Sequence, residues 1–186
     1  GTKQKSDIVS LNLRNINELQ QDGSAIKTID SALIKAKEAN AKVYLSGRDH
    51  RIIGFTPLLT KEEDNTMKAV NISNILKQEL DKYNKTAQES RILYGIGIHS
   101  GELVIERRGE DFKFVSLGNA LRKAKVLSET ANKEILISKE FHGRTIGKIR
   151  VQRLSPSIWK LSEMASKYKY EEFIDRFEKR RKLPKS

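Results

Sequence analysis

Few side chains in this sequence of 186 residues have the types and spacing that catalysis requires. The three histidines, His50, His99 and His142, do not have the spacing of metal ligands. The absence of cysteine excludes disulfides, thiolate metal sites and a cysteine nucleophile. Neither a G-x-x-x-x-G-K-[ST] loop nor a G-x-S-x-G elbow is present, which disfavours P-loop enzymes and hydrolases with that nucleophile.

Positive charge dominates the composition. The chain has 36 lysine and arginine residues against 24 acidic ones, a net charge of +12. Such a charge suits nucleotides, nucleic acid, anionic lipid or an acidic protein, or it simply covers solvated helix faces. The basic clusters lack the interleaved aromatic residues of an RNA-recognition sheet, so nucleic-acid binding is a secondary hypothesis. They comprise Arg107, Arg108, Arg144, Lys148, Arg150, Arg153 and the tail RRKLPKS.

One stretch, residues 91–131, has an ordered pattern of glycines and apolar runs. The apolar run at 92–98 predicts a strand interrupted by Gly95 and Gly97. The pattern then predicts a turn at 99–101, strands at 102–106 and 112–117, and a helix that opens at Gly118-Asn119.

This order resembles the core of class III nucleotidyl cyclase (adenylate/guanylate cyclase) catalytic domains. The family pattern reads roughly GIHxGxV, a hairpin, then GD/GN-x-V-N-x-x-x-R, and residues 95–106 and the strand EILIS at 134–138 match it well. The resemblance covers about residues 9–161. It implies a palm-like domain that joins a ribose hydroxyl to the α-phosphate of a nucleoside triphosphate, with two metal ions neutralising the charge. It also implies head-to-tail pairs of domains that share the active cleft.

Two aspartates hold the metal ions in this family. The resemblance places Asn12 at the first position and Asp49 at the second, with Arg48 as an extra residue. An amide brings no charge, whereas Mg²⁺ is usually held through carboxylates, so Mg²⁺ or Mn²⁺ is expected only together with a bound nucleotide. Asp7 lies five residues before Asn12 and should face the other side of the strand. Asp49 beside Gly47 also suits a simple turn.

Four other family positions are substituted. The ribose-orienting asparagine and the phosphate-stabilising arginine correspond to Arg122 and Val126. Arg122 could still meet a phosphate, or be an ordinary exposed helix residue, while Val126 brings no charge. The purine-selecting pair corresponds to Tyr44 and Val115, and Tyr44 suits either base stacking or the core. Tyr44, Val115 and Arg122 therefore form the candidate nucleotide cleft, and His99 is expected to be structural.

The remaining periodicity predicts the order β-α-α-β-β-α-β-β-β-α-β-β-β-α. Helices scattered among hairpin-connected strands favour an α+β fold with a mainly antiparallel sheet flanked by helices. The opening β-α-β-β-α-β is the ferredoxin-like unit, as in the cyclase palm. Ser24 is expected to cap a helix, and Thr60 with Glu63 to form a capping box before the next.

We expect one domain at residues 1–164, followed by an amphipathic helix and basic tail at 165–186. No apolar run reaches the length of a membrane span, and the start of the chain does not have the pattern of a signal peptide. Together with the absence of cysteine, this predicts a cytoplasmic domain.

Since most catalytic positions are substituted, the leading hypothesis is a catalytically inactive cyclase-like domain. It would act in signalling as a regulatory, dimerisation or nucleotide-binding module. Its partners would be a second copy or another cyclase-like domain, together with a nucleotide or other polyanion. One alternative is an active cyclase that forms cyclic AMP or cyclic GMP with metal ions bound at Asp49. The other is a basic nucleic-acid-binding domain.

Overall fold

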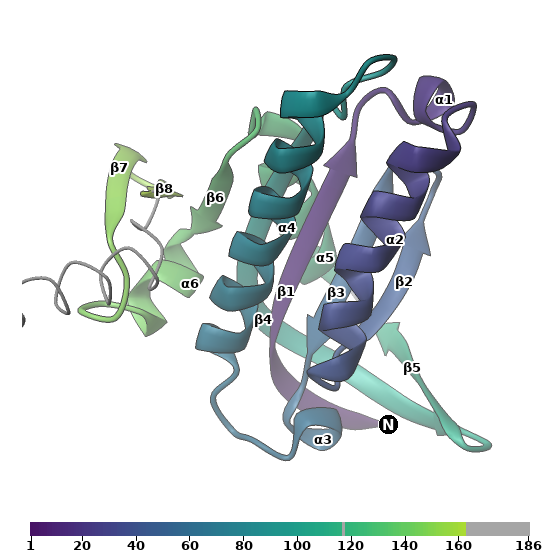
Figure 1. The fold of residues 1–186 in the computed structure, drawn as a ribbon. Coiled ribbons are helices and arrows are strands. Elements are labelled where there is room, and N and C mark those ends of the chain that lie inside the picture. The colour runs from purple at the N-terminus through teal and green to yellow at the C-terminus, as the bar shows by residue number, and fades with distance from the viewer. Residues whose placement is uncertain (117, 163–186) are drawn as a thin grey trace, which may run out of the picture.

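The computed structural model describes residues 1–116 and 118–162 (Figure 1). Its elements are β1 (Thr2–Leu13), α1 (Ile16–Leu19), α2 (Gly23–Glu38), β2 (Lys42–Ser46), β3 (His50–Phe55), α3 (Pro57–Thr60), α4 (Thr66–Thr86), β4 (Tyr94–Arg108), β5 (Asp111–Ser116), α5 (Gly118–Thr130), β6 (Ile135–Ser138), α6 (Lys139–Arg144), β7 (Val151–Ser155) and β8 (Ile158–Leu161). The predicted C-terminal helix and tail at 165–186, with the domain boundary at 164, lie outside the described residues. Within the described ranges, no helix is both long and apolar enough to cross a membrane.

The strands of the described residues form one sheet in the order β2-β3-β1-β4-β6-β8-β7, with β5 paired to β4. The pair β4–β6 is parallel and the other pairs are antiparallel. The order β2-β3-β1-β4, with α2 and α4 in the crossovers, is the ferredoxin-like arrangement. The predicted α+β class with a mainly antiparallel sheet is confirmed.

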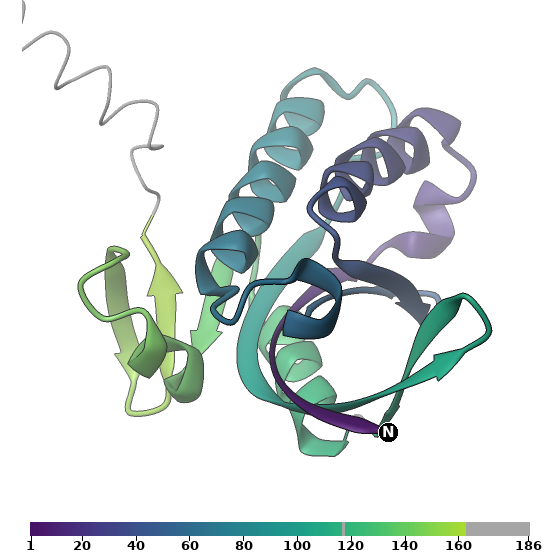
Figure 2. The same cartoon turned by 90° about the horizontal axis from the view of Figure 1, so that it is seen from below.

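Helices cover both faces of the sheet. The helices α2 and α4 lie side by side on one face, and α5 lies on the other (Figures 1 and 2). Alternation along β1 serves both layers, because Val9 and Leu11 belong to the larger core cluster with α2 and α4, while Ile8 joins the cluster that contains Ala120 and Ala124 of α5. The polar residues of β1 also alternate between the two faces, since Ser10 contacts Ser128 of α5 and Asp7 contacts Arg144 on the other face.

The long strand β4 differs from its prediction. The sequence predicted a turn at 99–101 between two strands, and that prediction was wrong. The strand continues through His99 and Ser100, which are buried and pair with Ile8 and Asp7 of β1. Twelve consecutive residue pairs with β1 keep this segment extended, so its glycines do not mark a turn.

Those glycines instead allow α5 to lie directly on β4. A Cβ atom at Gly97 would lie 2.5 Å from the carbonyl oxygen of Ala124 and 2.6 Å from Cβ of Leu127. Gly95 and Gly101 also face α5, and a Cβ atom at either would collide with it. The helix backbone therefore approaches the strand more closely than any side chain at these positions would permit.

Two helix caps and one helix also differ from the sequence prediction. The cap of α2 is Asp22, whose carboxylate accepts a hydrogen bond of 3.1 Å from the Ser24 amide, so Ser24 lies inside the helix. The expected capping box of Thr60 with Glu63 is absent, because Thr60 ends the short helix α3 and α4 begins only at Thr66. The helix α6, absent from the prediction, begins where the Ser138 hydroxyl accepts from the Phe141 amide.

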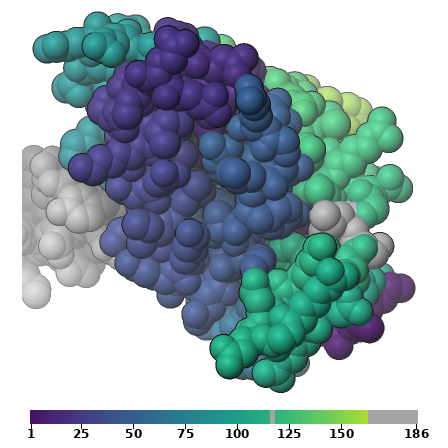
Figure 3. All heavy atoms as spheres, turned by 90° about the vertical axis from the view of Figure 1, so that its right-hand side faces the viewer, coloured from purple at the N-terminus to yellow at the C-terminus, as the bar shows by residue number. Residues whose placement is uncertain are grey.

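The β4–β5 hairpin extends away from the helices. In Figure 3 it is the green segment at the lower right, beside the blue segments that include β2 and β3. Its charged tip contains Gly109 in the left-handed region, with φ of 64°. The hairpin curls the sheet so that β5 approaches the opposite edge strand β2, and an ion pair between Lys42 and Asp111 joins the two.

The contact between α5 and β4 leads to the first prediction. The substitution Gly97→Ala should lower the free energy of unfolding by about 2–3 kcal/mol, because the added methyl overpacks the contact with α5. Urea denaturation monitored by circular dichroism measures it.

Gly143→Ala is the matched control, because nothing lies within 4 Å of a Cβ atom at this exposed helical position. It should stabilise the chain by about 0.5–1 kcal/mol, since alanine has the higher helix propensity. Equal effects of the two substitutions would show that α5 does not lie against Gly97.

Candidate functional site

Asn12 and Asp49, the two predicted metal positions, do come together at one end of the sheet. Asn12 is buried near the end of β1, on the face that α5 covers, and it pairs across the sheet with His50. Its side-chain amide donates to the Asp49 carbonyl at 3.4 Å and lies 3.2 Å from Nε2 of His50. The carboxylate of Asp49 is half exposed in the β2–β3 turn. The hairpin therefore brings these two residues into hydrogen-bond contact.

His50 is the centre of this cluster, and the sequence reasoning had assigned it no role. Its side chain is 4% exposed, and its ring lies between two carboxylates. Nδ1 is 3.0 Å from Asp49 Oδ1, and Nε2 is 3.0 Å from Oε1 of Glu129, near the end of α5. The imidazole thus joins the β2–β3 turn to the helix on the other side of the cluster.

These residues do not fit a pair of divalent metal ions. Asn12 supplies no charge, and one oxygen of Asp49 is already bonded to His50. In residues 1–116 and 118–162, no group of three or more histidine, aspartate and glutamate side chains is arranged to hold a metal ion. Asp7, the one carboxylate of β1, points to the opposite face, as alternation predicts.

A lysine of α5 also reaches the β2–β3 hairpin. Lys125 Nζ donates to the hydroxyl of Ser46 at 2.9 Å, one residue before the turn. Lys125 and Glu129 are four residues apart, so they project from the same side of the helix. The ammonium group brings positive charge to the β2–β3 hairpin, which further disfavours a cation there.

Arg122 and Val126 lie on another side of α5 and face a separate pocket. The pocket has a volume of about 430 Å³ and opens between α5, α6 and the start of β8. Within the described residues, neither Arg122 nor Lys139 makes an ion pair there, whereas Lys123 pairs with Glu140 at 3.0 Å. The lining residues are Asn119, Arg122, Lys123, Val126, Leu127, Ser138, Lys139, Glu140, Ser157 and Ile158. Unpaired cations beside apolar side chains suit an organic anion.

Tyr44 lies elsewhere, between β2 and β5. Its ring packs against Phe114 with centroids 5.8 Å apart and planes at 60°. Burial raises the pKa of the Tyr44 hydroxyl to about 12, and that buried hydroxyl has no hydrogen-bond partner among residues 1–116 and 118–162. Tyr44 and Arg122 line different pockets, and Val115, 42% exposed, lines neither. A single subunit therefore does not gather the three predicted nucleotide residues into one cavity.

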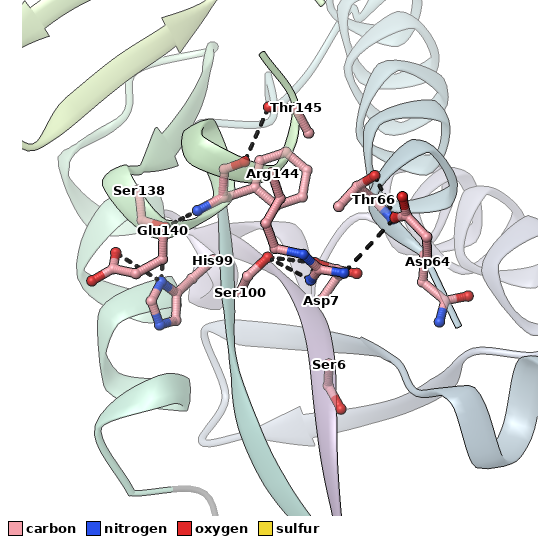
Figure 4. Close-up of polar contacts among 12 residues, drawn as sticks. Ser6, Asp7, Asp64, Thr66, His99, Ser100, Ser138, Glu140, Arg144 and Thr145 are labelled. Atoms are coloured by element: carbon pink, nitrogen blue, oxygen red, sulfur yellow. Dashed lines mark hydrogen bonds and ion pairs between the residues drawn. The ribbon is translucent and has the colours of Figure 1, made fainter. Parts of the chain in front are cut away.

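His99, expected to be structural, is buried and bonded. Its Nδ1 lies 2.8 Å from the hydroxyl of Ser138 and 3.6 Å from the carboxylate of Glu140 (Figure 4). Burial lowers the pKa of His99, which favours the neutral imidazole. His99 thereby links β4 to the start of α6, and its partners Ser138 and Glu140 line the Arg122 pocket.

A second polar cluster lies on the other face of the sheet, around Asp7. Asp7 is 1% exposed and accepts hydrogen bonds from the hydroxyl of Ser100 and, at 2.8 Å, from the guanidinium of Arg144 (Figure 4). Arg144 also reaches Asp64, 3.8 Å away on the loop before α4. Burial raises the pKa of Asp7 although Ser100 and Arg144 oppose the shift. This ion pair fastens α6 to β1, and no sequence pattern indicated it.

Comparison with known proteins identifies the fold. No family model matches this sequence, and no curated protein does either. Solved structures do: the dimeric guanylyl cyclase domain of the RhoGC fusion protein from the aquatic fungus Blastocladiella emersonii superposes with a TM-score of 0.69 at 14% identity, over 87% of this chain and 98% of that one. The adenylyl cyclase CyaB from P. aeruginosa gives 0.64 at 14% identity, over 87% and 95%. The guanylate cyclase domain of RhGC from Catenaria anguillulae, in complex with GTP, gives 0.62 at 15% identity, over 86% and 98%.

The chain has the fold of a class III nucleotidyl cyclase catalytic domain. The resemblance drawn from residues 95–106 and 134–138 is confirmed for the fold. Of the residues in the His50 cluster, the sequence reasoning named Asn12 and Asp49 as metal positions and gave no role to His50 or Glu129. The adjacent Asp49-His50 pair was visible in the sequence. The approach of Glu129, 79 residues later, follows only from the packing of α5 on β4.

The Asp7 cluster leads to a prediction about pH. Because the pKa of Asp7 is raised above its ordinary 3.8, the folded chain holds more protons than the unfolded chain above pH 3.8, until the folded pKa is passed. The contribution of Asp7 to stability therefore falls as pH rises through that window. Asp7→Asn removes the titration, so its free energy of unfolding should rise relative to the wild type between pH 3.8 and 7. Urea denaturation across this range measures the difference.

Asp64→Asn is the control with the opposite sign. Hydrogen bonds from Thr66 lower the pKa of Asp64 to about 2, so its stabilisation is present above pH 3.8 and is lost as pH falls toward 2. The wild type should therefore lose stability relative to Asp64→Asn below pH 3.8. A flat difference for Asp7→Asn, or one of the same sign as for Asp64→Asn, would contradict the raised pKa.

Proposed function

We propose that this chain is a cyclase-like domain without cyclase activity, which binds an organic anion and pairs with a second cyclase-like domain. The observation that carries the proposal is the contact of His50 with Asp49 and Glu129 at the predicted metal position. Cyclisation needs charge neutralised on both the attacking and the leaving oxygen atoms. The carboxylates that remain at this site are bonded to an imidazole and are not arranged around a metal ion.

Substitution at the phosphate side supports the same conclusion. Val126 stands where the cyclase pattern has the arginine that stabilises the developing phosphate charge, and it can form no hydrogen bond. Arg122 retains a positive charge four residues earlier, at the mouth of the 430 Å³ pocket. Arg122 and Lys139 suit the phosphate groups of a nucleotide or another organic anion, while Val126 and Leu127 suit its apolar part. The pocket can bind such a ligand without acting on it.

Two exposed apolar residues support pairing. Val115 of β5 and Val126 of α5 are 42% and 50% exposed, although each occupies a position where the cyclase pattern has a polar residue. The domains of this family pair across the corresponding surface, and an apolar side chain there favours contact with protein over water. With a charge of +12 per chain, the surfaces that meet should be the uncharged ones.

The proposal predicts that the chain forms no cyclic nucleotide. After incubation with ATP or GTP and Mn²⁺, mass spectrometry should detect no cyclic AMP or cyclic GMP, because the metal ligands and the transition-state arginine are absent. An active cyclase in the same assay is the positive control. Calorimetry with the same nucleotides should show binding that Arg122→Ala weakens about tenfold, the loss of one charge-assisted contact.

Cyclic product that disappears in Asp49→Ala would overturn the proposal, since it would show that Asp49 binds a catalytic metal ion. Nucleotide binding that is unchanged in Arg122→Ala would remove the assigned pocket but leave the inactivity in place. The activity assay and the binding assay therefore test the inactivity and the ligand pocket independently.

Pairing is tested by analytical ultracentrifugation at moderate salt. We expect a dimer, and Val126→Glu should weaken it by about tenfold or more, because a charge would be buried in the interface. Leu154→Glu is the matched control, since Leu154 of β7 is 49% exposed but lies away from α5. A monomer at high concentration, or equal effects of the two substitutions, would refute pairing through this surface.

A further inference from the structure

A groove runs between two unpaired strand edges. Among the described residues, β3 is the only strand that pairs with β2 through backbone hydrogen bonds, and β4 is the only one that pairs with β5. A pocket of about 450 Å³ separates the two free edges. It is lined from both sides by Lys42, Tyr44, Arg108, Asp111, Phe112, Lys113 and Phe114. Because residues 111–114 line it consecutively, the pocket follows the backbone edge of β5 and not only one of its faces.

The groove continues along β2. A second hollow of about 360 Å³ shares Lys42 and Asp111 with the first. It is lined by Lys37, Asn40, Ala41, Lys42, Val43, Leu59 and Asp111. The Lys42–Asp111 ion pair, at 2.9 Å, crosses the groove between the two hollows. Asp111 is 76% exposed, so little desolvation opposes its release from Lys42 when another carboxylate arrives.

The strand directions allow one more strand in this space. Four successive antiparallel pairings connect β2, β3, β1, β4 and β5, so β2 and β5 run in the same direction. A strand laid between them could be antiparallel to both and would satisfy two rows of free N–H and C=O groups. Closing the sheet in this way would remove both of its exposed edges on this side.

The side chains of the groove favour a particular kind of strand. Tyr44, Phe112 and Phe114 offer apolar contact, and the buried Tyr44 hydroxyl has no hydrogen-bond partner in the part of the chain that the structure describes. Basic side chains outnumber acidic ones at the rim, with Lys37, Lys42, Arg108 and Lys113 against Asp111. An extended segment with alternating acidic and apolar residues would complement both the charge and the aromatic surface.

We propose that the groove between β2 and β5 is a docking site for an acidic, extended peptide segment of a partner protein, which adds a strand to the sheet. The segment is antiparallel to both neighbours, places its carboxylates against the lysines and Arg108, and places its apolar side chains against Phe112 and Phe114. One of its backbone carbonyl groups accepts a hydrogen bond from Tyr44. This site is separate from the Arg122 pocket and does not depend on the absence of cyclase activity.

Peptide binding tests the proposal on the full chain. The probe is the fluorescein-labelled peptide Glu-Val-Glu-Phe-Glu-Val-Glu, measured by fluorescence anisotropy. Two control peptides are matched to it. The first has lysine in place of every glutamate, and the second keeps the sequence but has N-methyl groups on alternate backbone amides. The acidic peptide should bind at least about tenfold more tightly than either, because the first lacks the charges and the second lacks the backbone donors. Hydrogen exchange should show new protection in β2 and β5 with the acidic peptide only.

Variants separate a specific site from the general positive charge. Arg108→Glu with Lys113→Glu should weaken binding about tenfold or more, while Lys27→Glu with Lys82→Glu changes the net charge equally on exposed positions of α2 and α4 and should have little effect. Tyr44→Phe keeps the ring on Phe114 and should weaken binding several-fold without unfolding the chain.

Equal binding of the acidic and N-methylated peptides, or equal effects of the two double variants, would overturn the proposal. Protection confined to elements other than β2 and β5 would do the same. ATP or GTP that protects β2 and β5 in place of the peptide would show that the groove is a nucleotide site, and would also refute it.

Discussion

The close contact between α5 and β4 is the constraint on which the rest of the structure depends. Glycines at 95, 97 and 101 leave no side chain between the helix and the strand, so the helix backbone lies on the sheet. That approach carries Lys125 and Glu129 to the β2–β3 hairpin and directs Arg122 and Val126 toward the neighbouring pocket. Arg14 completes the arrangement by donating to the carbonyl groups of Glu129 and Ala131 at the helix end.

The helix thereby converts the predicted metal position into an internal contact of the protein. A buried imidazole between two carboxylates, with an ammonium group nearby, joins α5 to the hairpin through hydrogen bonds that a divalent ion would have to displace. The residues that maintain the fold are therefore different from the residues at the predicted metal position. The glycine contact maintains the fold that this chain shares with cyclase domains, whatever side chains stand at Asn12 and Val126.

Sequence reasoning predicted most elements because their cores follow simple periodicity. Alternation in β1, helical spacing in α4 and the glycine at the start of α5 are local signals, and they also carried the resemblance to the cyclase fold. The prediction of a turn at His99–Gly101 was wrong because glycine can either form a turn or let a helix approach a strand closely. The two cases have the same local sequence pattern. The Asp7–Arg144 pair joins residues 137 positions apart, a distance at which no local pattern operates.

By itself, the sequence determined the α+β class, the ferredoxin-like order and the excess of positive charge. Each depends on residue type, or on spacing within one element. Only the tertiary structure decided that His50 lies between Asp49 and Glu129, that Tyr44 and Arg122 line different pockets, and that β2 and β5 leave a groove between free edges. These depend on strand register and on the approach of one helix to the sheet. Both are set by packing between segments far apart in the chain.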